Sequence, residues 1–249
     1  MRRLPVLWKG MIKLRLDKML SHAGFGSRKE VAVLIRSGRV FVNGMPARDP
    51  GMNAEPGTAS VDGKAVQLSR NFYLMMHKPA GILTQAESPS APSVLDLLPE
   101  IYQKRGCMPV GRLDKDTTGL LLLTTDGVLA HRLIAPKRHV DKVYHVWCDG
   151  NIGEEDKAAF LEGIRLKDFT AKPAVLEILA PQEARVTVHE GKYHQIKRMF
   201  GARGLNVVRL HRESFGPIDL PDDLHPGEYR ELTDAQIAAL YAAAEMEQA

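Results

Sequence analysis

The sequence predicts an α+β protein in two parts: a small basic α/β domain at residues 14–70 and a larger domain at residues 71–249 with a mostly antiparallel mixed sheet. In the first part, two short helical patterns precede short strand patterns. In the second, longer strand patterns follow one another with helices set irregularly among them, which is typical of antiparallel pairing. The 249 residues, 44% of them hydrophobic, are enough to give both parts a packed core.

Composition excludes several classes of protein. No uncharged apolar run reaches the ~18 residues that a membrane span needs, so no membrane association is expected. The apolar stretch within residues 1–8 is shorter than a signal peptide requires. Two cysteines, Cys107 and Cys148, are too few for a disulfide framework and are expected to be buried thiols. These features predict a soluble protein of the cytoplasm.

The charge is unevenly distributed along the chain. Residues 1–70 contain 13 lysines and arginines against 5 aspartates and glutamates, whereas the rest of the chain is slightly acidic. A basic first segment indicates contact with a polyanion such as nucleic acid, although a solvated surface rich in lysine and arginine would have the same composition.

Two short helices open the first domain. Apolar residues recur at helical spacing in residues 14–21, and the glycines at 24 and 26 end that helix. Ser27 and Glu30 then have the spacing of a capping box, which begins a second helix with a stripe of Val31, Leu34 and Ile35. Residues 39–44 form a short strand that runs into an Asn-Gly turn, a strong hairpin signal.

This segment resembles the S4 RNA-binding domain, through Arg15-Leu16-Asp17-Lys18, Ser27-Arg28 and the run from Ile35 to Gly44. The resemblance implies that the basic faces of the two helices grip the phosphates of structured RNA. Such contacts position an RNA without reading its sequence, and they weaken as salt rises. The candidate RNA-binding residues are Arg15, Lys18, Arg28, Lys29, Arg36 and Arg39.

The larger domain is expected to alternate strands with four helices. Strands are predicted at 72–76, 120–124, 142–148, 174–179, 185–189 and 207–210, and helices at 127–134, 154–162, 195–202 and 234–244. The last helix begins with a Thr-Asp-Ala-Gln capping box at 233–236 and carries Ile237, Leu240 and Tyr241 on one face. The four leucines at 120–123 predict a strand that is buried on both faces.

Residues 111–119, Gly-Arg-Leu-Asp-Lys-Asp-Thr-Thr-Gly, are the most informative stretch of the chain. This charged loop leads directly into the leucine strand, and binding or catalytic groups concentrate on such loops of a rigid scaffold. Asp116 is expected to bond the backbone of Thr117 and Thr118.

Two segments imitate metal sites, and neither is expected to bind a metal. Residues 114–119 begin like a calcium loop, but the twelfth position holds Thr125 where such a loop has glutamate. His189 and His194 are five residues apart, one more than in the helical zinc-protease motif, and Gly191 disfavours a helix there.

Together with two later segments, this loop resembles the pseudouridine synthases, in particular the RsuA type that acts on the small ribosomal subunit and carries an S4 domain. Gly111-Arg112-Leu113-Asp114 and Thr117-Thr118-Gly119-Leu120 match the catalytic loop of that family, and Asp114 falls on its essential aspartate. Lys142-Val143-Tyr144 matches the second motif, whose tyrosine packs beside the target base. The run from Tyr193 to Phe200 matches the third motif, which lines the pocket, with Lys197 where the family often has arginine.

The resemblance implies that uridine becomes pseudouridine by cleavage of the C1′–N1 bond and re-attachment through C5, with no cofactor. Asp114 is the candidate catalytic carboxylate, and both a nucleophilic and a proton-abstracting role remain open. Lys197 would keep that carboxylate ionised. Tyr144 would stack on the uracil, a contact worth ~1–3 kcal/mol, and its hydroxyl could move a proton at C5. Ile196 would form an apolar wall, and Arg112 would bind phosphate to offset the cost of extruding the base.

The expected partner is ribosomal RNA, most readily 16S RNA within a small-subunit assembly intermediate, bound by a monomer. Residues 170–177 and 190–195 favour 16S over 23S RNA, through resemblance alone. A 23S enzyme and a non-catalytic RNA-binding assembly factor remain as alternatives. A base-removing glycosidase would generally need a second carboxylate, which none of the matched motifs supplies.

Overall fold

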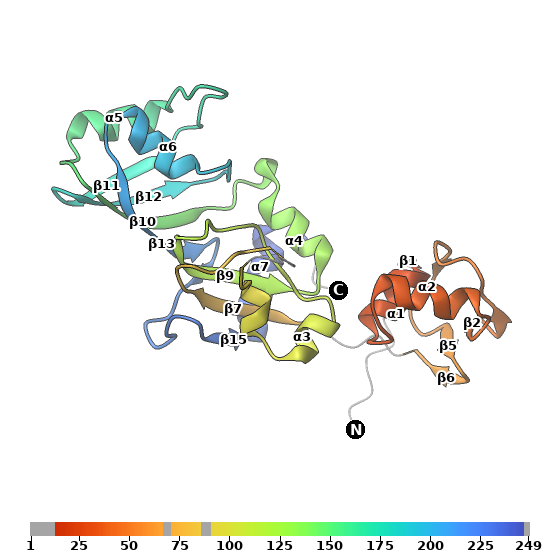
Figure 1. The fold of residues 1–249 in the computed structure, drawn as a ribbon. Helices are drawn as coiled ribbons and strands as arrows, with labels where there is room; N and C mark the ends of the chain where they lie inside the picture. Colours follow the sequence, from red (N-terminus) through yellow and green to blue (C-terminus); the bar gives the residue numbers. More distant parts are fainter. Residues whose placement is uncertain (1–12, 67–70, 86–90, 247–249) are drawn as a thin grey trace. The chain divides into compact units, whose positions relative to one another are not determined.

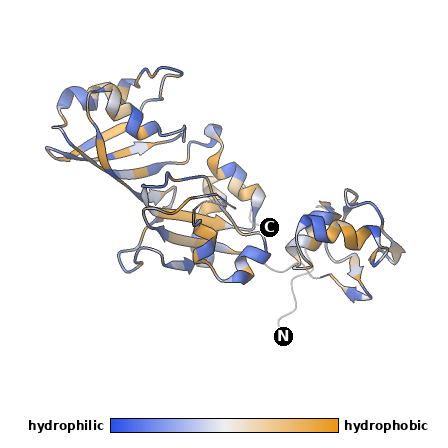
Figure 2. Cartoon of the chain, viewed as in Figure 1, coloured by the Kyte–Doolittle hydropathy of each residue, from blue (hydrophilic) through white to orange (hydrophobic). Residues whose placement is uncertain are grey.

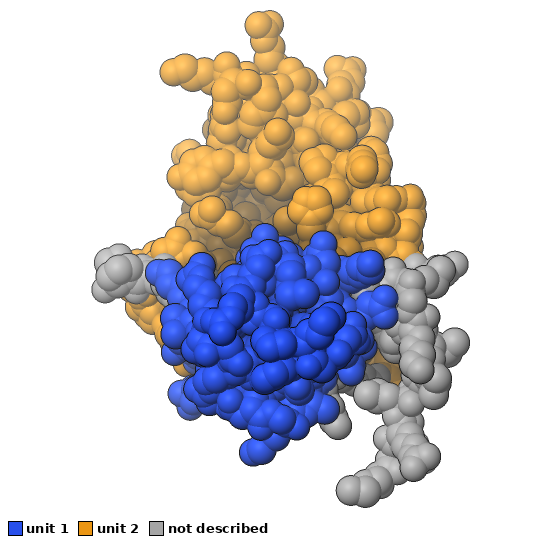
Figure 3. Space-filling view, turned by 90° about the vertical axis from the view of Figure 1, so that its right-hand side faces the viewer, with its two compact units in different colours: residues 1–71, 99–107 blue, residues 72–98, 108–249 orange. Residues whose placement is uncertain are grey.

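A computed structural model describes residues 13–66, 71–85 and 91–246 of the chain. Two compact units divide it: residues 1–71 with 99–107, and residues 72–98 with 108–249 (Figure 3). The linker expected near residues 69–71 lies mostly outside the described residues, as do residues 1–12 and 247–249. Among the described residues, no helix has both the length and the apolar character needed to span a bilayer.

The first unit places two helices beside short antiparallel strands (Figure 1). The Asn43–Gly44 turn joins β2 to β3, with both residues at positive φ, which confirms the predicted hairpin. The four-stranded sheet has the order β3-β2-β5-β6, and β1 pairs separately with β4. The elements are β1 (Leu14–Arg15), α1 (Leu16–His22), α2 (Arg28–Arg36), β2 (Val40–Val42), β3 (Met45–Pro46), β4 (Asn53–Ala54), β5 (Ala59–Val61), β6 (Lys64–Ala65) and, grouped with this unit, α3 (Glu100–Lys104).

A single apolar cluster holds the first unit together. The predicted capping box is present: the Ser27 hydroxyl accepts from the Glu30 backbone N–H, and the Glu30 carboxylate accepts from the Ser27 N–H. Val31 and Ile35 of α2 are fully buried, whereas Leu34 is only partly buried. Leu16, Met19 and Leu20 of α1 are fully buried in the same cluster.

The second unit is built on one long sheet with the order β11-β12-β10-β13-β9-β7-β15. Its pairs are antiparallel except for the short parallel contact between β13 and β9, which confirms the predicted mostly antiparallel mixed sheet. The strands are β7 (Tyr73–Lys78), β8 (Met108–Pro109), β9 (Thr118–Thr124), β10 (Lys142–Cys148), β11 (Val175–Ala180), β12 (Glu183–Val188), β13 (Val207–Phe215), β14 (Ile218–Asp219) and β15 (Tyr229–Glu231).

The helices of this unit follow the sequence prediction closely. α4 (Gly127–Ile134), α5 (Glu154–Glu162) and α6 (Gln195–Ala202) have the predicted bounds, and α7 (Asp234–Ala243) ends one residue earlier than expected. The sequence did not predict α3, the short strands β8, β14 and β15, or the 3-10 turns at Val94–Leu97 and Pro136–Arg138. It also ended β13 five residues early, at residue 210 instead of Phe215.

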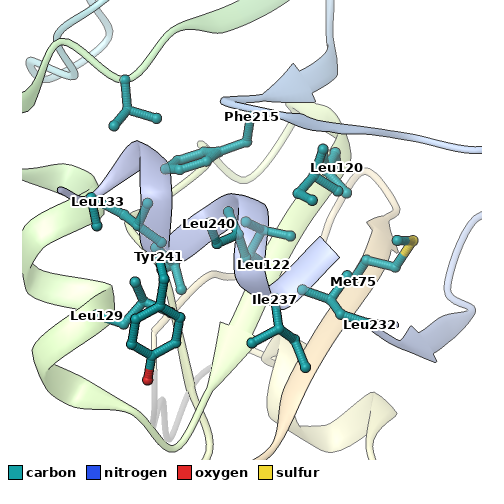
Figure 4. Close-up of a cluster of buried hydrophobic side chains, with 14 of the residues drawn as sticks. Met75, Leu120, Leu122, Leu129, Leu133, Phe215, Leu232, Ile237, Leu240 and Tyr241 are labelled. Carbon is teal, nitrogen blue, oxygen red and sulfur yellow. The ribbon is translucent and has the colours of Figure 1, made fainter. Parts of the chain in front are cut away.

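Helices α4 and α7 bury the core of this half of the sheet (Figure 4). Leu120 and Leu122 of β9 face Leu133 of α4 and Leu240 of α7 in one cluster, and the apolar bands of the strands are visible in Figure 2. All four leucines at 120–123 are at most 2% exposed, which confirms a strand buried on both faces. Cys107 and Cys148 are buried thiols, as expected.

A buried carboxylate caps α4 and ties it to α7. Asp126 Oδ1 accepts the backbone N–H groups of Val128 and Leu129, which the helix itself leaves unpaired. Its Oδ2 accepts the hydroxyl of Tyr241 at 2.5 Å and that of Tyr73 at 3.2 Å. Burial and the Asp126 hydrogen bond raise the pKa of Tyr241 well above its ordinary value, so the phenol stays a donor.

Candidate active site

The charged loop at 111–117 lies over a fully buried lysine. Lys78, the last residue of β7, donates from Nζ to the carbonyl oxygens of Pro79 at 3.0 Å, Lys115 at 3.3 Å and Thr117 at 2.9 Å. Burial lowers the pKa of Lys78 to about 8, against the opposing attraction of Asp116. The Lys78 ammonium therefore fixes the main chain of the residues that follow Asp114 in the loop.

A second set of bonds holds the part of the loop that precedes Asp114. The Thr84 hydroxyl donates to the Leu113 carbonyl at 2.6 Å and accepts the Leu113 N–H at 3.2 Å. The Thr117 N–H donates to the carbonyl of Asp114 at 3.1 Å, which closes a tight turn. The backbone of Asp114 is thus bonded on both sides, while its side chain stays 27% exposed.

Gly119, where the loop enters β9, brings two strands into unusually close contact. Its φ is +107°, and a Cβ there would lie 2.2 Å from the carbonyl oxygen of Arg212 on β13. Gly119 pairs directly with Arg212 in the parallel β9–β13 contact. No other residue type fits this position, because the neighbour is main chain and cannot turn aside.

A cavity of about 470 Å³ opens beside the loop, within the usual range for small-molecule sites. Four of the five site residues expected on the catalytic domain line it: Arg112 and Asp114 of the loop, Tyr144 of β10 and Ile196 of α6. Tyr144 is 8% exposed and Ile196 is 5% exposed, so both present buried surface to the cavity. Leu113, Leu210 and Phe215 contribute further apolar wall.

Lys197 lies beside the carboxylates of the loop but does not line the cavity. Its Nζ is 3.8 Å from Asp114 Oδ2, whereas both carboxylate oxygens of Asp116 lie within 2.7 Å of it. Lys197 therefore lies near Asp114, where it was expected, but its shorter contacts are with Asp116. Asp116 was expected to bond the Thr117 and Thr118 backbone, but its side chain bonds Lys197 instead.

Electrostatic surroundings favour the ionised form of Asp116. Burial would raise the pKa of Asp116, but the hydrogen bonds and charge of Lys197 outweigh it and hold that pKa below its ordinary value. Asp114 has His194 Nε2 at 3.5 Å in addition to Lys197. His194 has a left-handed backbone (φ 49°) at the N-terminus of α6, and its ring stacks on that of Tyr193, 3.9 Å between centroids.

The segment that precedes α6 is not helical, in agreement with the reasoning from Gly191. Glu190 Oε1 accepts the Gln195 side-chain amide at 2.8 Å and the Lys172 backbone N–H at 2.9 Å, and these bonds fix the entry to α6. Within residues 13–66, 71–85 and 91–246 there is no group of three or more His, Cys, Asp or Glu side chains placed to hold a metal ion.

Sequence reasoning assigned no role to two cations that line the cavity, Lys142 and Arg212. Strand alternation could have identified Lys142, because it shares a face of β10 with Tyr144. Arg212 lies in the part of β13 that the sequence did not predict. It is 1% exposed, and its guanidinium bonds the Leu120 carbonyl at 2.7 Å and the Tyr144 hydroxyl at 3.5 Å.

The predicted RNA-binding cations of the first unit fall into two groups, those with an ion pair and those without one. Arg15 and Arg28 lie near the carboxylate of Asp17, and Arg39 pairs with Asp62. No ion pair within the described residues holds the other three, which are Lys18, Lys29 and Arg36. Three of the six predicted RNA-binding cations, all on α1 and α2, are therefore available to a polyanion.

Comparison with protein families gives two matches along the chain. Residues 72–202 match the RNA pseudouridylate synthase family, and residues 14–59 match the S4 domain. The order of the two matches agrees with the order of the two units.

Relatives cover nearly the whole chain. An uncharacterized RNA pseudouridine synthase of Bacillus subtilis, YtzG, is 43% identical over 234 residues, which are 91% of this chain and 98% of that protein. Ribosomal small subunit pseudouridine synthase A of Escherichia coli K12 is 40% identical over 91% of this chain and 100% of its own length. The enzyme of the same name from Vibrio cholerae is 40% identical over 92% of this chain.

A solved structure shares the fold. The crystal structure of a pseudouridylate synthase superposes with a TM-score of 0.67 at 35% sequence identity, and covers 91% of this chain and 99% of its own.

Proposed function

This chain belongs to the RNA pseudouridylate synthase family, and from that premise we propose that it converts a uridine of 16S ribosomal RNA to pseudouridine with Asp114 as the catalytic carboxylate. One observation carries the assignment: Asp114 is the loop carboxylate that both lines the cavity and faces two basic groups, Lys197 and His194. The neighbouring Asp116 is 73% exposed and already occupied by Lys197.

The chemistry asked of Asp114 needs an ionised carboxylate at the lip of a largely apolar cavity. It would either bond to the ribose or remove a proton from it when the C1′–N1 bond breaks. Lys197 Nζ lies 3.8 Å and His194 Nε2 lies 3.5 Å from this carboxylate, so both can contact it during the reaction. The bonds of Lys78 and Thr84 support this role, because they hold the loop backbone in place before substrate arrives.

Tyr144 and Ile196 would hold the extruded base between an aromatic ring and an aliphatic wall. Both are buried against the cavity, and base–aromatic stacking contributes ~1–3 kcal/mol. Arg112, exposed at the rim, would bind a phosphate flanking the target uridine and offset part of the cost of extrusion. The unpaired cations of α1 and α2 would bind phosphates of the RNA.

The choice of 16S RNA rests on relatives that are named small-subunit enzymes and match end to end. We further propose that the substrate is met in the cytoplasm as part of a small-subunit assembly intermediate and is bound by a monomer. Mapping pseudouridine after incubation with 16S transcripts, 23S transcripts and assembly particles tests this. Modification of 23S RNA alone would overturn the substrate assignment, and binding without modification would favour an assembly factor.

Asp114→Asn tests the residue. We expect pseudouridine formation to be lost while RNA affinity stays within about threefold, because the amide keeps the shape but cannot act as base or nucleophile. Asp116→Asn is the matched control on the same loop and should keep its rate within about tenfold. An Asp114→Asn variant that reacts at the wild-type rate would refute the assignment.

A further inference from the structure

Two buried cations form the floor of the cavity. Lys142 of β10 is 7% exposed, Arg212 of β13 is 1% exposed, and both line the cavity together with Tyr144. They flank one aromatic ring: Lys142 Nζ lies 5.1 Å and Arg212 Cζ lies 5.2 Å from the centroid of Phe215. The two charges therefore act on the same small volume.

Neither cation forms an ion pair with a carboxylate of the described residues, although Asp141 attracts Lys142 at longer range. Arg212 donates hydrogen bonds from Nε to the Leu120 carbonyl and from Nη1 to the Tyr144 hydroxyl. Lys142 Nζ donates to the Val140 carbonyl at 2.8 Å. Arg212 Nη2 is buried with no hydrogen-bond partner. Since buried charges are ordinarily paired, an anion in the cavity would stabilise these two cations, and the other charged residues that line the cavity include the carboxylates of Asp114 and Glu190 as well as Arg112 and Lys192.

The walls show which kind of anion fits. Leu113, Ile196 and Leu210 give the cavity an apolar wall among its charged groups, and such a wall suits a flat heterocycle better than a hydrated phosphate. Arg212 Nη2 is buried, so its charge is poorly screened by water and acts on the cavity that Arg212 lines. Arg112, which is exposed at the rim of the cavity, is more accessible to a phosphate than these two buried cations are.

We propose that Arg212 and Lys142 stabilise the negative charge carried by the uracil while it is detached from the ribose. This inference rests on the proposed function. When the C1′–N1 bond breaks, its electron pair leaves with the base, and Asp114 meets the change at the ribose by bonding to C1′ or taking a proton. When C5 bonds to C1′, the Asp114–C1′ bond breaks, or Asp114 returns the proton that it took from the ribose. C5 then loses its proton and N1 gains one, and the charge on the base disappears.

Electrostatic support of this kind has a large effect on rate. Removing one donor from a preorganised anion site typically lowers turnover 10²–10³-fold, because the donor acts where charge develops. Burial and then the neighbouring charge of Arg212 lower the pKa of Lys142 to about 8, so the ammonium remains charged at neutral pH. Both groups would therefore contribute under ordinary assay conditions.

The test measures single-turnover pseudouridine formation on the mapped 16S substrate. We expect Arg212→Gln to lower the rate about 10²-fold with RNA affinity within threefold, and Arg212→Lys, which keeps the charge, to recover most of it. The matched control is Arg209→Gln, on the same strand but stacked over Trp147 outside the cavity, which should keep the wild-type rate. Urea unfolding establishes that each variant is folded, and Lys142→Met carries the same test should Arg212→Gln not fold.

A second substrate separates charge stabilisation from a purely structural role. RNA with 5-fluorouridine at the target position has a base whose anion is already stabilised by fluorine. Cleavage of its C1′–N1 bond should therefore be slowed by Arg212→Gln less than about tenfold. An equal loss with both bases, no loss with uridine, or an equal loss in Arg209→Gln would overturn the inference. A wild-type chain that forms no pseudouridine would overturn the proposed function itself, and the inference with it.

Discussion

Replacing Lys78 by methionine should reduce activity far more than stability. Methionine has a similar length and volume but no donor, so the ammonium bonds to the carbonyls of Pro79, Lys115 and Thr117 are lost. The Lys115 carbonyl keeps a second donor, the Gly81 N–H at 2.7 Å. All three carbonyls therefore lose the Lys78 bond, and those of Pro79 and Thr117 have no second donor among the described residues.

The two sides of the free-energy balance are similar in size. Two unsatisfied carbonyls cost about 2–6 kcal/mol, at ~1–3 kcal/mol each. Against this, the mutation removes the penalty of burying a charge: the pKa of Lys78 falls from 10.5 to about 8, which at 1.36 kcal/mol per pKa unit is about 3 kcal/mol. The free energy of unfolding should therefore fall by no more than about 3 kcal/mol, and the unit stays folded.

The loop, by contrast, loses the group that fixes it beneath Asp114. A displacement of about 1 Å at a catalytic group can cost 10²-fold in rate, so we expect Lys78→Met to lower single-turnover pseudouridine formation at least 10²-fold. Lys115→Met is the control, since it changes an exposed side chain and leaves the backbone carbonyl in place. Urea unfolding and single-turnover assays on the same preparations give both quantities. A Lys78→Met variant within threefold of the wild-type rate would refute the reasoning.

Three further predictions concern other parts of the chain. Tyr241→Phe should lower the free energy of unfolding by about 1.5–3 kcal/mol, measured by urea titration, because it removes a charge-assisted bond to Asp126; a change below 0.5 kcal/mol would contradict this. Lys142→Met should reduce the rise in the free energy of unfolding between pH 8 and 10.5, because in that range the unfolded wild-type chain binds the proton that folded Lys142 has lost. Unfolding curves at both pH values measure this rise, and a rise equal to that of the wild type would contradict the prediction. Replacing Lys29 and Arg36 by alanine should flatten the plot of log affinity against log salt by roughly 1.5 units, as filter binding at several salt concentrations would show, and an unchanged slope would exclude α2 from the RNA contact.

Local signals predicted the helices and the small hairpin well. Ser27 with Glu30, Asn43 with Gly44, and the four consecutive leucines of β9 each act through bonds or burial within a few residues of themselves. Their outcome depends little on the rest of the chain, so periodicity and capping rules were sufficient.

The parts that the sequence did not predict depend on long-range packing. The strand expected at residues 72–76 continues to Lys78, whose burial is produced by a loop almost forty residues later. Arg212 lies in the continuation of β13, which forms because β9 and β10 both pair with it. The preference of Lys197 for Asp116 over Asp114 is a difference of about 1 Å between two carboxylates, which no spacing rule determines.

The main-chain contact at Gly119 separates what can change in this protein from what cannot. Because Gly119 abuts the backbone of Arg212, the loop that carries Asp114 and the strand that carries the cavity floor are joined through peptide groups. Side chains at the mouth of the cavity, such as Arg112 and Tyr193, take no part in that join. Substitution of these side chains, by evolution or design, could therefore admit a different RNA while the reacting groups keep their spacing. A β-carbon at position 119, by contrast, would clash with the Arg212 backbone and disrupt the site in every such variant, whichever RNA that variant recognises.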